Sequence, residues 1–454
     1  MSDVSNVSLS ADQIVQNFSE IHPPLNQAQA VFEAHRCLYC YDAPCIQACP
    51  THIDVPSFIK KIASGNLKGS ARVILDANPI GSTCSRVCPV EALCEGACVE
   101  KTLMKQPIQI GRLQRYAMDH VISKQINVFK AGEANGKSVG IIGSGAAGLS
   151  CATYLARLGY AVTIYERRAK AGGLDTYGMA EYKMTQRHSA DEVAMIERLG
   201  VQFRLGCEIG RDISFADLEA THDAVFIGVG LGATNKLGLP GEELAGVHDA
   251  LEFIEQIKTR DWASVPMAKT VAVIGAGNTA IDAVTQAKRL GAEQVLLIYR
   301  RTRSEMSAYE YEYELAKQDA VEFRWQTAPI EIVADVDGKR VAALRCVRTA
   351  LQADGKLINV AGSEFDLPVA MVIKAIGQQK QRSFLASVPN VNVDAGGRVV
   401  VNATTMQTDN PKYFAGGDCV NGGAEAVDAA QQGKHGAMGI HKMLMGEDVK
   451  FAGA

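Results

Sequence analysis

The chain has 454 residues, with 46 Lys and Arg against 50 Asp and Glu, so its formal net charge is only −4. Surfaces that bind nucleic acid are normally basic, so this balance argues against nucleic acid as a partner. At about 150 residues per domain the length suggests about three domains.

The cysteines are clustered, because eight of the twelve fall within residues 37–98. The N-terminus has no basic segment followed by an apolar one, and the longest apolar runs are of strand length. We therefore expect a cytoplasmic protein that does not enter a membrane. In a reducing cytosol, dense cysteines bind metals or carry electrons more often than they form disulfides.

Residues 1–130 form the first predicted domain, which carries the cysteine cluster. Patches of helical periodicity, as in SFIKKIASGNLKGSARVIL, predict short helices and loops around whatever the cysteines hold. The cysteine spacing is Cys37-x2-Cys40-x4-Cys45-x3-Cys49-Pro50, then Cys84-x3-Cys88-Pro89 and Cys94-x3-Cys98. The first group resembles the spacing in bacterial ferredoxins, which bind [4Fe-4S] clusters. Zinc is the competing interpretation, but zinc sites favour paired C-x2-C knuckles, and only Cys37 and Cys40 have that spacing.

After a linker at Lys130–Lys137, strands alternate with amphipathic helices, which is typical of a parallel α/β sheet. Two units, Ser138–Arg168 and Thr270–Arg301, each run strand, glycine turn, helix, strand. Each is a complete start of a dinucleotide-binding domain, so two dinucleotides are expected. The predicted fold is an α-helical iron-sulfur domain followed by two Rossmann-like α/β domains, as in a two-dinucleotide-binding flavoprotein.

The first unit carries G-x-G-x-x-G at Gly143, Gly145 and Gly148, which permits a tight turn, close approach of a pyrophosphate and helix packing. Glu166 ends the next strand, where a carboxylate can accept both ribose hydroxyls. The C-terminal segment around Gly417 and Asp418 resembles the second FAD fingerprint of such flavoproteins, with a helix N-terminus facing the flavin. The residues expected to bind FAD are Gly143, Ser144, Gly145, Ala146, Ala147, Gly148, Glu166, Arg167, Gly173, Leu174, Lys183, Ile209, Gly230, Gly417, Asp418, Ala426 and Val427.

The second unit has no acid after its second strand, where Tyr299 is followed by arginines. Guanidinium groups suit a 2′-phosphate, so NADP(H) is favoured over NAD(H). The alternative is that these arginines form a solvated surface run. The expected nucleotide-binding residues are Gly275, Ala276, Gly277, Asn278, Thr279, Ala280, Arg300, Arg301, Arg303, Ala375 and Gly377. This domain, residues 237–371, would be inserted between two parts of the FAD domain, residues 136–236 and 372–454.

The segments CLYCYDAPCIQACP, GSTCSRVCPVEALCEGAC and IGRLQRYAMD together resemble the N-terminal domain shared by the glutamate synthase small subunit and dihydropyrimidine dehydrogenase. The resemblance continues through both nucleotide domains. It implies one [4Fe-4S] cluster on Cys37, Cys40, Cys45 and Cys98, and a second on Cys49, Cys88, Cys94 and Gln114. At the position of Gln114, the resemblance implies an acid in the glutamate synthase small subunit and a glutamine in dihydropyrimidine dehydrogenase. The glutamine of this chain therefore favours the pyrimidine enzyme. Cys84 has no ligand role in the pattern and is expected to be buried or redox-silent.

The resemblance implies an electron relay. NADPH would reduce FAD, and single electrons would pass through both clusters to an FMN-containing partner subunit that reduces uracil and thymine to 5,6-dihydropyrimidines. The chain ends just after the FAD helix, so we expect the substrate site on a separate polypeptide of a hetero-oligomer, and no catalytic side chain in this one. The alternatives are a glutamate synthase small subunit, a ferredoxin-NADP oxidoreductase subunit or, in another class, a zinc-stabilised docking module on a flavin reductase.

Overall fold

The computed structural model describes residues 9–453. The chain divides into two compact units. The larger unit comprises His22–Thr176, Lys183–Gly232 and Lys380–Ala454, and the smaller unit comprises Met1–Ile21, Tyr177–Tyr182 and Ala233–Gln379. Within the described residues, no helix combines the length and the apolar character needed to cross a membrane.

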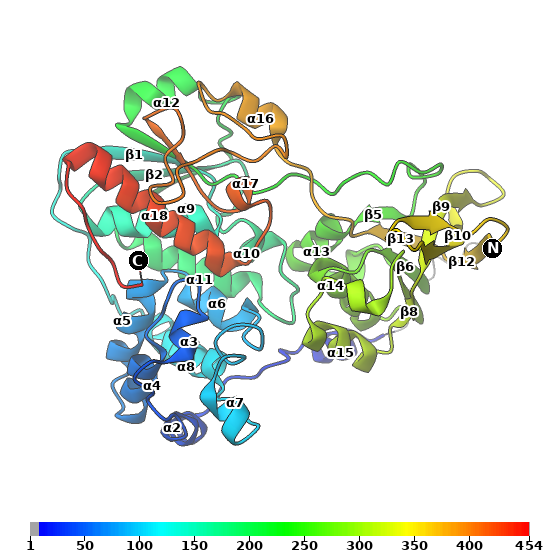
Figure 1. Cartoon of the computed structure of the whole chain (residues 1–454), viewed down its shortest axis with the longest axis horizontal. Helices are drawn as coiled ribbons and strands as arrows, with labels where there is room; N and C mark the ends of the chain where they lie inside the picture. The colour runs from blue at the N-terminus through cyan, green and yellow to red at the C-terminus, as the bar shows by residue number, and fades with distance from the viewer. Residues whose placement is uncertain (1–8, 454) are drawn as a thin grey trace. The chain divides into compact units, whose positions relative to one another are not determined.

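The cysteine-bearing part of the larger unit is helical, as predicted (Figure 1). Apolar side chains recur at helical spacing in α4 and α5, so each helix turns one apolar face inward. Phe58, Ile59, Ile74 and Leu113 are fully buried in the resulting core. The helices are α2 (Gln27–His35), α3 (Pro44–Gln47), α4 (Val55–Ala63), α5 (Leu67–Ala77), α6 (Gly81–Val87), α7 (Val99–Leu103) and α8 (Ile110–Ser123).

A parallel five-stranded sheet in the order β14-β4-β1-β2-β3 completes the larger unit. Helices α9 and α18 pack against each other and bury their apolar residues together with β1 and β4. Carboxyl ends of parallel strands meet at one edge, so the loops after β1 and β14 converge there. The elements are β1 (Ser138–Ile142), α9 (Ala146–Arg157), β2 (Ala161–Glu166), α10 (Leu174–Tyr177, whose last residue belongs to the smaller unit), α11 (Gln186–Glu197), β3 (Gln202–Leu205), α12 (Phe215–Thr221), β4 (Ala224–Ile227), α16 (Arg382–Ser387), β14 (Tyr413–Ala415), α17 (Asp418–Asn421) and α18 (Ala426–Met445).

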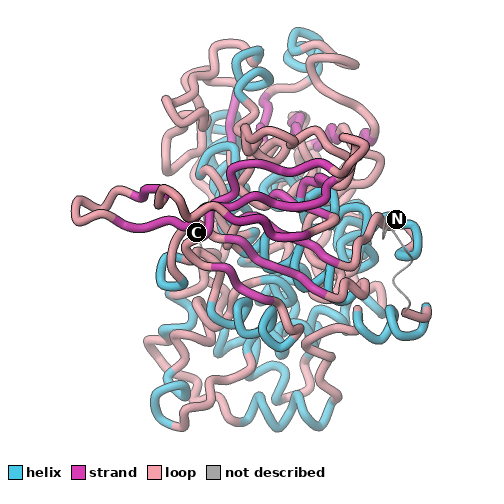
Figure 2. The backbone as a smooth tube through the Cα atoms, turned by 90° about the vertical axis from the view of Figure 1, so that its right-hand side faces the viewer, coloured by secondary structure: helices cyan, strands magenta, loops and turns pink. Residues whose placement is uncertain are grey.

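The smaller unit contains a second parallel five-stranded sheet, in the order β5-β13-β6-β7-β8, and an antiparallel sheet of β9 to β12 (Figure 2). Both predicted strand-turn-helix-strand units are thus present, as β1-α9-β2 and β6-α14-β7. The elements are α1 (Ala11–Asn17), β5 (Val247–Asp249), α13 (Ala250–Thr259), η1 (Trp262–Ser264), β6 (Thr270–Ile274), α14 (Asn278–Arg289), β7 (Gln294–Ile298), η2 (Arg303–Glu305), α15 (Glu310–Gln318), β8 (Glu322–Arg324), β9 (Thr327–Ala334), β10 (Val341–Leu351), β11 (Leu357–Asn359), β12 (Phe365–Pro368) and β13 (Met371–Lys374).

Helix α1 belongs to the smaller unit, which differs from the predicted domain of residues 1–130. Phe18 stacks on Trp262 with ring centroids 4.7 Å apart, and Asn17 Nδ2 donates to the carbonyl oxygen of Arg289 at 2.9 Å. The helix is therefore fixed by contacts with residues more than 200 positions away, which its local sequence does not indicate.

Candidate functional site

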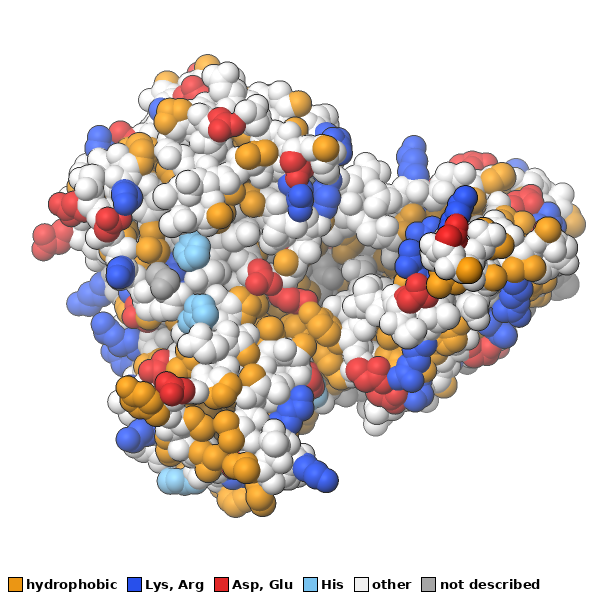
Figure 3. Space-filling model, viewed as in Figure 1, with side chains coloured by type: hydrophobic (Ala, Val, Ile, Leu, Met, Phe, Trp, Pro, Cys, Tyr) orange, Lys and Arg blue, Asp and Glu red, His pale blue; other side chains and the backbone are white. Residues whose placement is uncertain are grey.

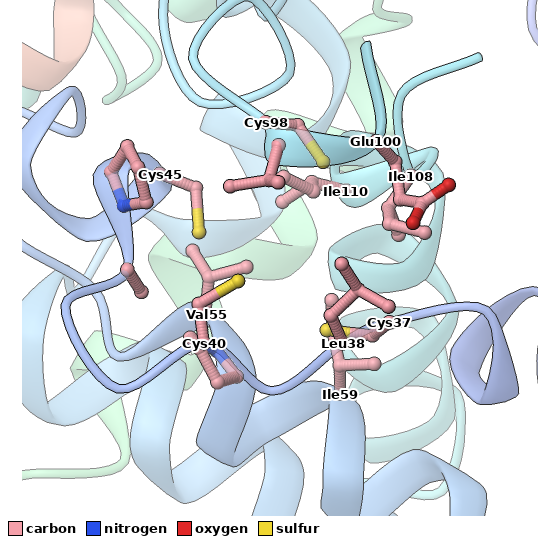
Figure 4. Close-up of a pocket in the computed structure, with 14 residues that line it drawn as sticks. Cys37, Leu38, Cys40, Cys45, Val55, Ile59, Cys98, Glu100, Ile108 and Ile110 are labelled. Atoms are coloured by element: carbon pink, nitrogen blue, oxygen red, sulfur yellow. The ribbon is translucent and has the colours of Figure 1, made fainter. Parts of the chain in front are cut away.

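The first cysteine group surrounds one cavity. Cys37 and Cys40 lie in the loop after α2, Cys45 lies in α3 and Cys98 caps α7. Figure 4 shows their four sulfur atoms turned toward a common space, between apolar side chains that include Val55 and Ile59. The structure thus brings together the four cysteines that the resemblance assigned to one cluster, although Cys98 is 53 positions after Cys45.

The thiols of this group influence one another's ionisation. Burial raises the pKa of Cys45 to about 12, and the nearby Cys98, Cys37 and Cys40 add to the rise. Burial also raises the pKa of Cys37, with Cys40 and Cys98 contributing. Crowded thiolates of this kind are stabilised when a metal centre neutralises them. The four-cysteine donor set around this cavity therefore fits an iron-sulfur cluster.

The second group consists of Cys49, Cys88 and Cys94. A hydrogen bond with Cys84 and burial raise the pKa of Cys88, and Cys49 and Cys94 are close enough to add to the rise. Burial, Glu95 and Cys49 similarly raise the pKa of Cys94. Cys84 itself is buried, as predicted, and its sulfur lies 3.1 Å from Asn78 Nδ2.

Gln114 is a buried residue of α8, the helix that packs on α6. Its Nε2 donates a hydrogen bond to the carbonyl oxygen of Gly81 at the start of α6, at 2.8 Å. Helix α6 ends at Val87, and Cys88 is its C-cap. The amide nitrogen is therefore held at the start of the helix that Cys88 caps, and no hydrogen bond to Oε1 accompanies it among the contacts of this side chain with the described residues.

Sequence reasoning missed Glu192, a fully buried carboxyl on α11. Its Oε1 accepts a hydrogen bond from Ser82 N at 2.8 Å, and its Oε2 accepts one from the Thr83 hydroxyl at 2.5 Å. Burial raises the pKa of Glu192 to about 7, although the Thr83 and Ser82 donors oppose the rise. Glu192 thus fixes the start of α6 against the nucleotide-binding part, and no sequence motif marks it.

The first glycine motif forms a tight loop between β1 and α9. Gly143 has φ +97°, and a Cβ atom on Gly148 would lie 2.1 Å from the Gly143 carbonyl oxygen, so neither position tolerates a side chain. A Cβ atom on Gly145 would meet nothing within 4 Å. Gly173 comes close to the same loop, since its Cβ would lie 2.8 Å from the Gly145 Cα. The loop leaves open space against its backbone, which fits a pyrophosphate.

The other predicted FAD residues are distributed around this loop. Glu166 ends β2 and its Oε2 accepts from the Ser144 amide at 3.1 Å and from the Ser144 hydroxyl at 2.6 Å. A Cβ atom on Gly417 would lie 3.1 Å from the Ala147 Cβ, so the loop after β14 reaches the start of α9. Asp418 follows, and burial raises the pKa of its carboxyl. Val427 and Ile209 are buried, Ala426, Lys183 and Gly230 are half-buried, and Arg167 and Leu174 are exposed.

The second glycine motif is built in the same way. Gly275 has φ +130° and its Cβ would lie 2.2 Å from the Ala375 carbonyl oxygen, which brings Ala375 to the loop. Gly277 caps α14, Asn278 Oδ1 accepts from Tyr309 N at 3.2 Å, and Ala280 is fully buried. Among the remaining predicted residues, Ala276 is buried and Thr279 is half-buried. The carbonyl oxygen of Gly377 accepts a hydrogen bond from Asn235 N at 2.8 Å.

The three arginines after β7 are exposed, and two of them have acidic partners. Arg301 pairs with Glu305 at 3.1 Å, and Arg303 pairs with Glu310. The sequence did not indicate these pairs. Exposed ion pairs are worth about 0–1 kcal/mol, so a phosphate could displace the carboxylates at little cost.

Residues 14–126 match the family described as dihydropyrimidine dehydrogenase domain II, 4Fe-4S cluster, and residues 137–433 match the pyridine nucleotide-disulphide oxidoreductase family. The chain is 35% identical over 447 residues to the NADPH glutamate synthase small chain of Escherichia coli, covering 94% of each protein. It is 32% identical over 433 residues to the NAD-dependent dihydropyrimidine dehydrogenase subunit PreT of the same organism, covering 95% of this chain and 98% of that one. FprA of Mycobacterium tuberculosis, solved in complex with NADPH, shares the fold, with a TM-score of 0.54 at 18% identity over 69% of this chain and 87% of its own.

Proposed function

Because the chain belongs to the pyridine nucleotide-disulphide oxidoreductase family, we propose that it is the electron-input subunit of a two-subunit dihydropyrimidine dehydrogenase. The overall reaction would be NAD(P)H + H⁺ + uracil → NAD(P)⁺ + 5,6-dihydrouracil, with uracil bound by an FMN-containing partner subunit. Gln114 carries the assignment to pyrimidines. It is a buried amide at the position where the glutamate synthase subunit that the chain resembles has an acid.

The larger unit would hold FAD and both clusters. The open space at Gly145 would receive the pyrophosphate, Glu166 the ribose hydroxyls and Asp418 the ribityl region. Cys37, Cys40, Cys45 and Cys98 would bind one cluster, and Cys49, Cys88, Cys94 and the Oε1 of Gln114 the other. When bound, FAD would accept a hydride and the clusters would carry its two electrons singly. The chain's own residues would bind, orient and insulate these groups.

The smaller unit would bind NADPH. Gly275 and Gly277 would receive its pyrophosphate at the start of α14, and Arg301 and Arg303 its 2′-phosphate. The relatives named above carry different nicotinamides in their names, NADPH for one and NAD for the other. The preference for NADPH therefore rests on the arginines and on the lack of an acid directly after Tyr299.

A glutamate synthase small subunit is the second candidate, favoured by 35% identity over nearly the whole of both chains. One experiment separates the two. The chain is isolated together with the subunit encoded next to it, and NADPH oxidation is followed with uracil or with glutamine and 2-oxoglutarate. The proposal expects oxidation that depends on uracil. Oxidation that depends only on glutamine and 2-oxoglutarate would replace it with the second candidate.

A further inference from the structure

We propose that an exposed apolar surface beside the first cysteine group is the docking site of the redox protein that takes electrons from this chain, an inference that rests on the electron relay proposed above. Five large side chains form it and define what we call the α2–α7 surface. They are Phe32, Leu38, Tyr41, Leu103 and Met104, each between 52 and 99% exposed.

The five side chains belong to segments that are tied together. The Arg36 guanidinium donates to the carbonyl oxygen of Gln106 at 2.7 Å, and Glu33 Oε1 accepts from Gln109 N at 2.9 Å. These bonds hold the end of α2 against the segment that follows α7, and the Tyr39 hydroxyl of the cysteine loop donates to the carbonyl oxygen of Ala34 in α2 at 3.1 Å. Hydrophobic side chains are visible in Figure 3 in the region where α2 and α7 lie in Figure 1.

The surface is an unusual concentration of apolar groups. Fourteen large hydrophobic side chains are exposed within the described residues, and five of them lie on this one surface. Scattered apolar side chains are normal on a protein surface, whereas a contiguous group marks an interaction site. Tyr and Phe are also among the residues that are enriched at protein interfaces.

The sulfur atoms of the first group lie directly behind this surface. Leu38 lines the same cavity as Cys37, Cys40, Cys45 and Cys98 (Figure 4). Both groups pack on the core of the helical part, but Cys49 and Cys88 of the second group also pack against the core that contains α9 and α18. An acceptor on the α2–α7 surface would therefore be next to the first cluster, with the second cluster on the side of the nucleotide-binding sheet.

The charges around the surface specify the partner's chemistry. Lys60, Lys101 and Lys105 are exposed on the segments that carry the surface or pack beside it, Asp42 and Asp54 are the exposed acids of residues 27–60 and 99–109, and Glu33 and Glu100 are buried. These segments thus expose three lysines against two acids, although the whole chain carries a net charge of −4. Complementary charges raise association rates and orient partners. The occupant is accordingly a redox protein with an apolar contact face ringed by acidic side chains.

The test uses the full chain, tagged at its N-terminus, expressed from its own locus and isolated with its redox partner. The dissociation constant of this complex is measured by mass photometry for wild type, for a Phe32→Asp/Met104→Asp double variant and for Val336→Asp. Val336 is an exposed apolar residue of the smaller unit and serves as the matched control. Phe32 and Met104 are exposed and are not ligands, and NADPH-driven ferricyanide reduction checks that each variant remains a working flavoprotein.

We expect the double variant to bind the partner at least about tenfold more weakly than wild type. Added salt should also weaken binding of the wild-type chain. The Val336→Asp variant should bind the partner as wild type does, and both variants should reduce ferricyanide at the wild-type rate. Equal binding by the double variant, or isolation of the chain without a redox partner, would overturn the inference. The inference would also be overturned if the wild-type chain were a homodimer and the double variant a monomer, because a second copy of the chain would then cover the surface. A complex that is lost in the double variant but never oxidises NADPH with uracil would refute the proposed function and leave the docking surface standing.

Discussion

The Nζ atom of Lys434 lies 3.4 Å from the carbonyl oxygen of Thr51, which connects α18 to the loop after Cys49. Lys434 is fully buried, and its Nζ also donates to the carbonyl oxygens of Ala452 and Gly453 at 2.9 and 3.1 Å. Burial lowers the pKa of its ammonium group to about 8, against the raising effects of Cys49 and Asp76. One helix thus runs from the proposed flavin site to the second cysteine group.

Replacing Lys434 should therefore loosen this connection. We expect Lys434→Met to lower the free energy of unfolding by about 2–4 kcal/mol, because three carbonyl oxygens lose their donor. Lys442→Met removes an exposed lysine of the same helix and should change the free energy of unfolding by less than about 1 kcal/mol. Urea unfolding followed by circular dichroism measures both. If the two variants unfold at the same urea concentration, Lys434 does not hold the loop.

Glu192 should make stability depend on pH. Its pKa of about 7 lies above the ordinary value of 4.5, so between these pH values the folded protein keeps a proton that the unfolded chain has lost. Its contribution to stability is therefore full below about pH 4.5 and is lost as the pH rises through 7. Relative to wild type, the free energy of unfolding of Glu192→Gln should rise by up to about 3 kcal/mol between pH 5 and pH 8. Glu197→Gln, at an exposed position of the same helix, should show no such trend. Parallel pH profiles for wild type and Glu192→Gln would contradict the assignment.

The arginines after β7 should select NADPH. An Arg301→Ala/Arg303→Ala double variant is expected to raise the KM for NADPH by about 10–100-fold, since charge-assisted hydrogen bonds to the 2′-phosphate are lost. The KM for NADH should not change. Arg260→Ala, at an exposed position of the same unit, is the control in the same steady-state assay. A wild-type chain that turns over NADH as well as NADPH would show that these arginines are only a solvated surface run.

Gln114 should set the potential of one cluster. Gln114→Glu places a carboxylate where an amide stands, and added negative charge near a cluster lowers its reduction potential. A redox titration followed by electron paramagnetic resonance should show one midpoint moving downward and the other unchanged. Gln125→Glu, at an exposed position after α8, should leave both midpoints in place. Unchanged midpoints in Gln114→Glu would mean that this residue is not a ligand.

Local patterns in the sequence were sufficient to predict both nucleotide-binding units. The glycines at Gly143 and Gly275 follow apolar strands because only glycine fits the positive φ and the close backbone contacts there. The long-range contacts could not be read in this way. Lys434 and Glu192 look like surface residues of amphipathic helices, yet each is buried by a segment more than 100 positions away. The division of the cysteines into two sets likewise came from family resemblance, because spacing alone does not join Cys98 to Cys37.

The number of iron-sulfur clusters is the most direct test of the account, since both the relay and the docking site depend on two of them. Iron, acid-labile sulfide, zinc and flavin are measured per chain in the anaerobically purified protein. Two [4Fe-4S] clusters and one flavin predict about eight irons, about eight sulfides and about one FAD. About four irons would remove one cluster from the relay, and zinc without iron would contradict the account altogether.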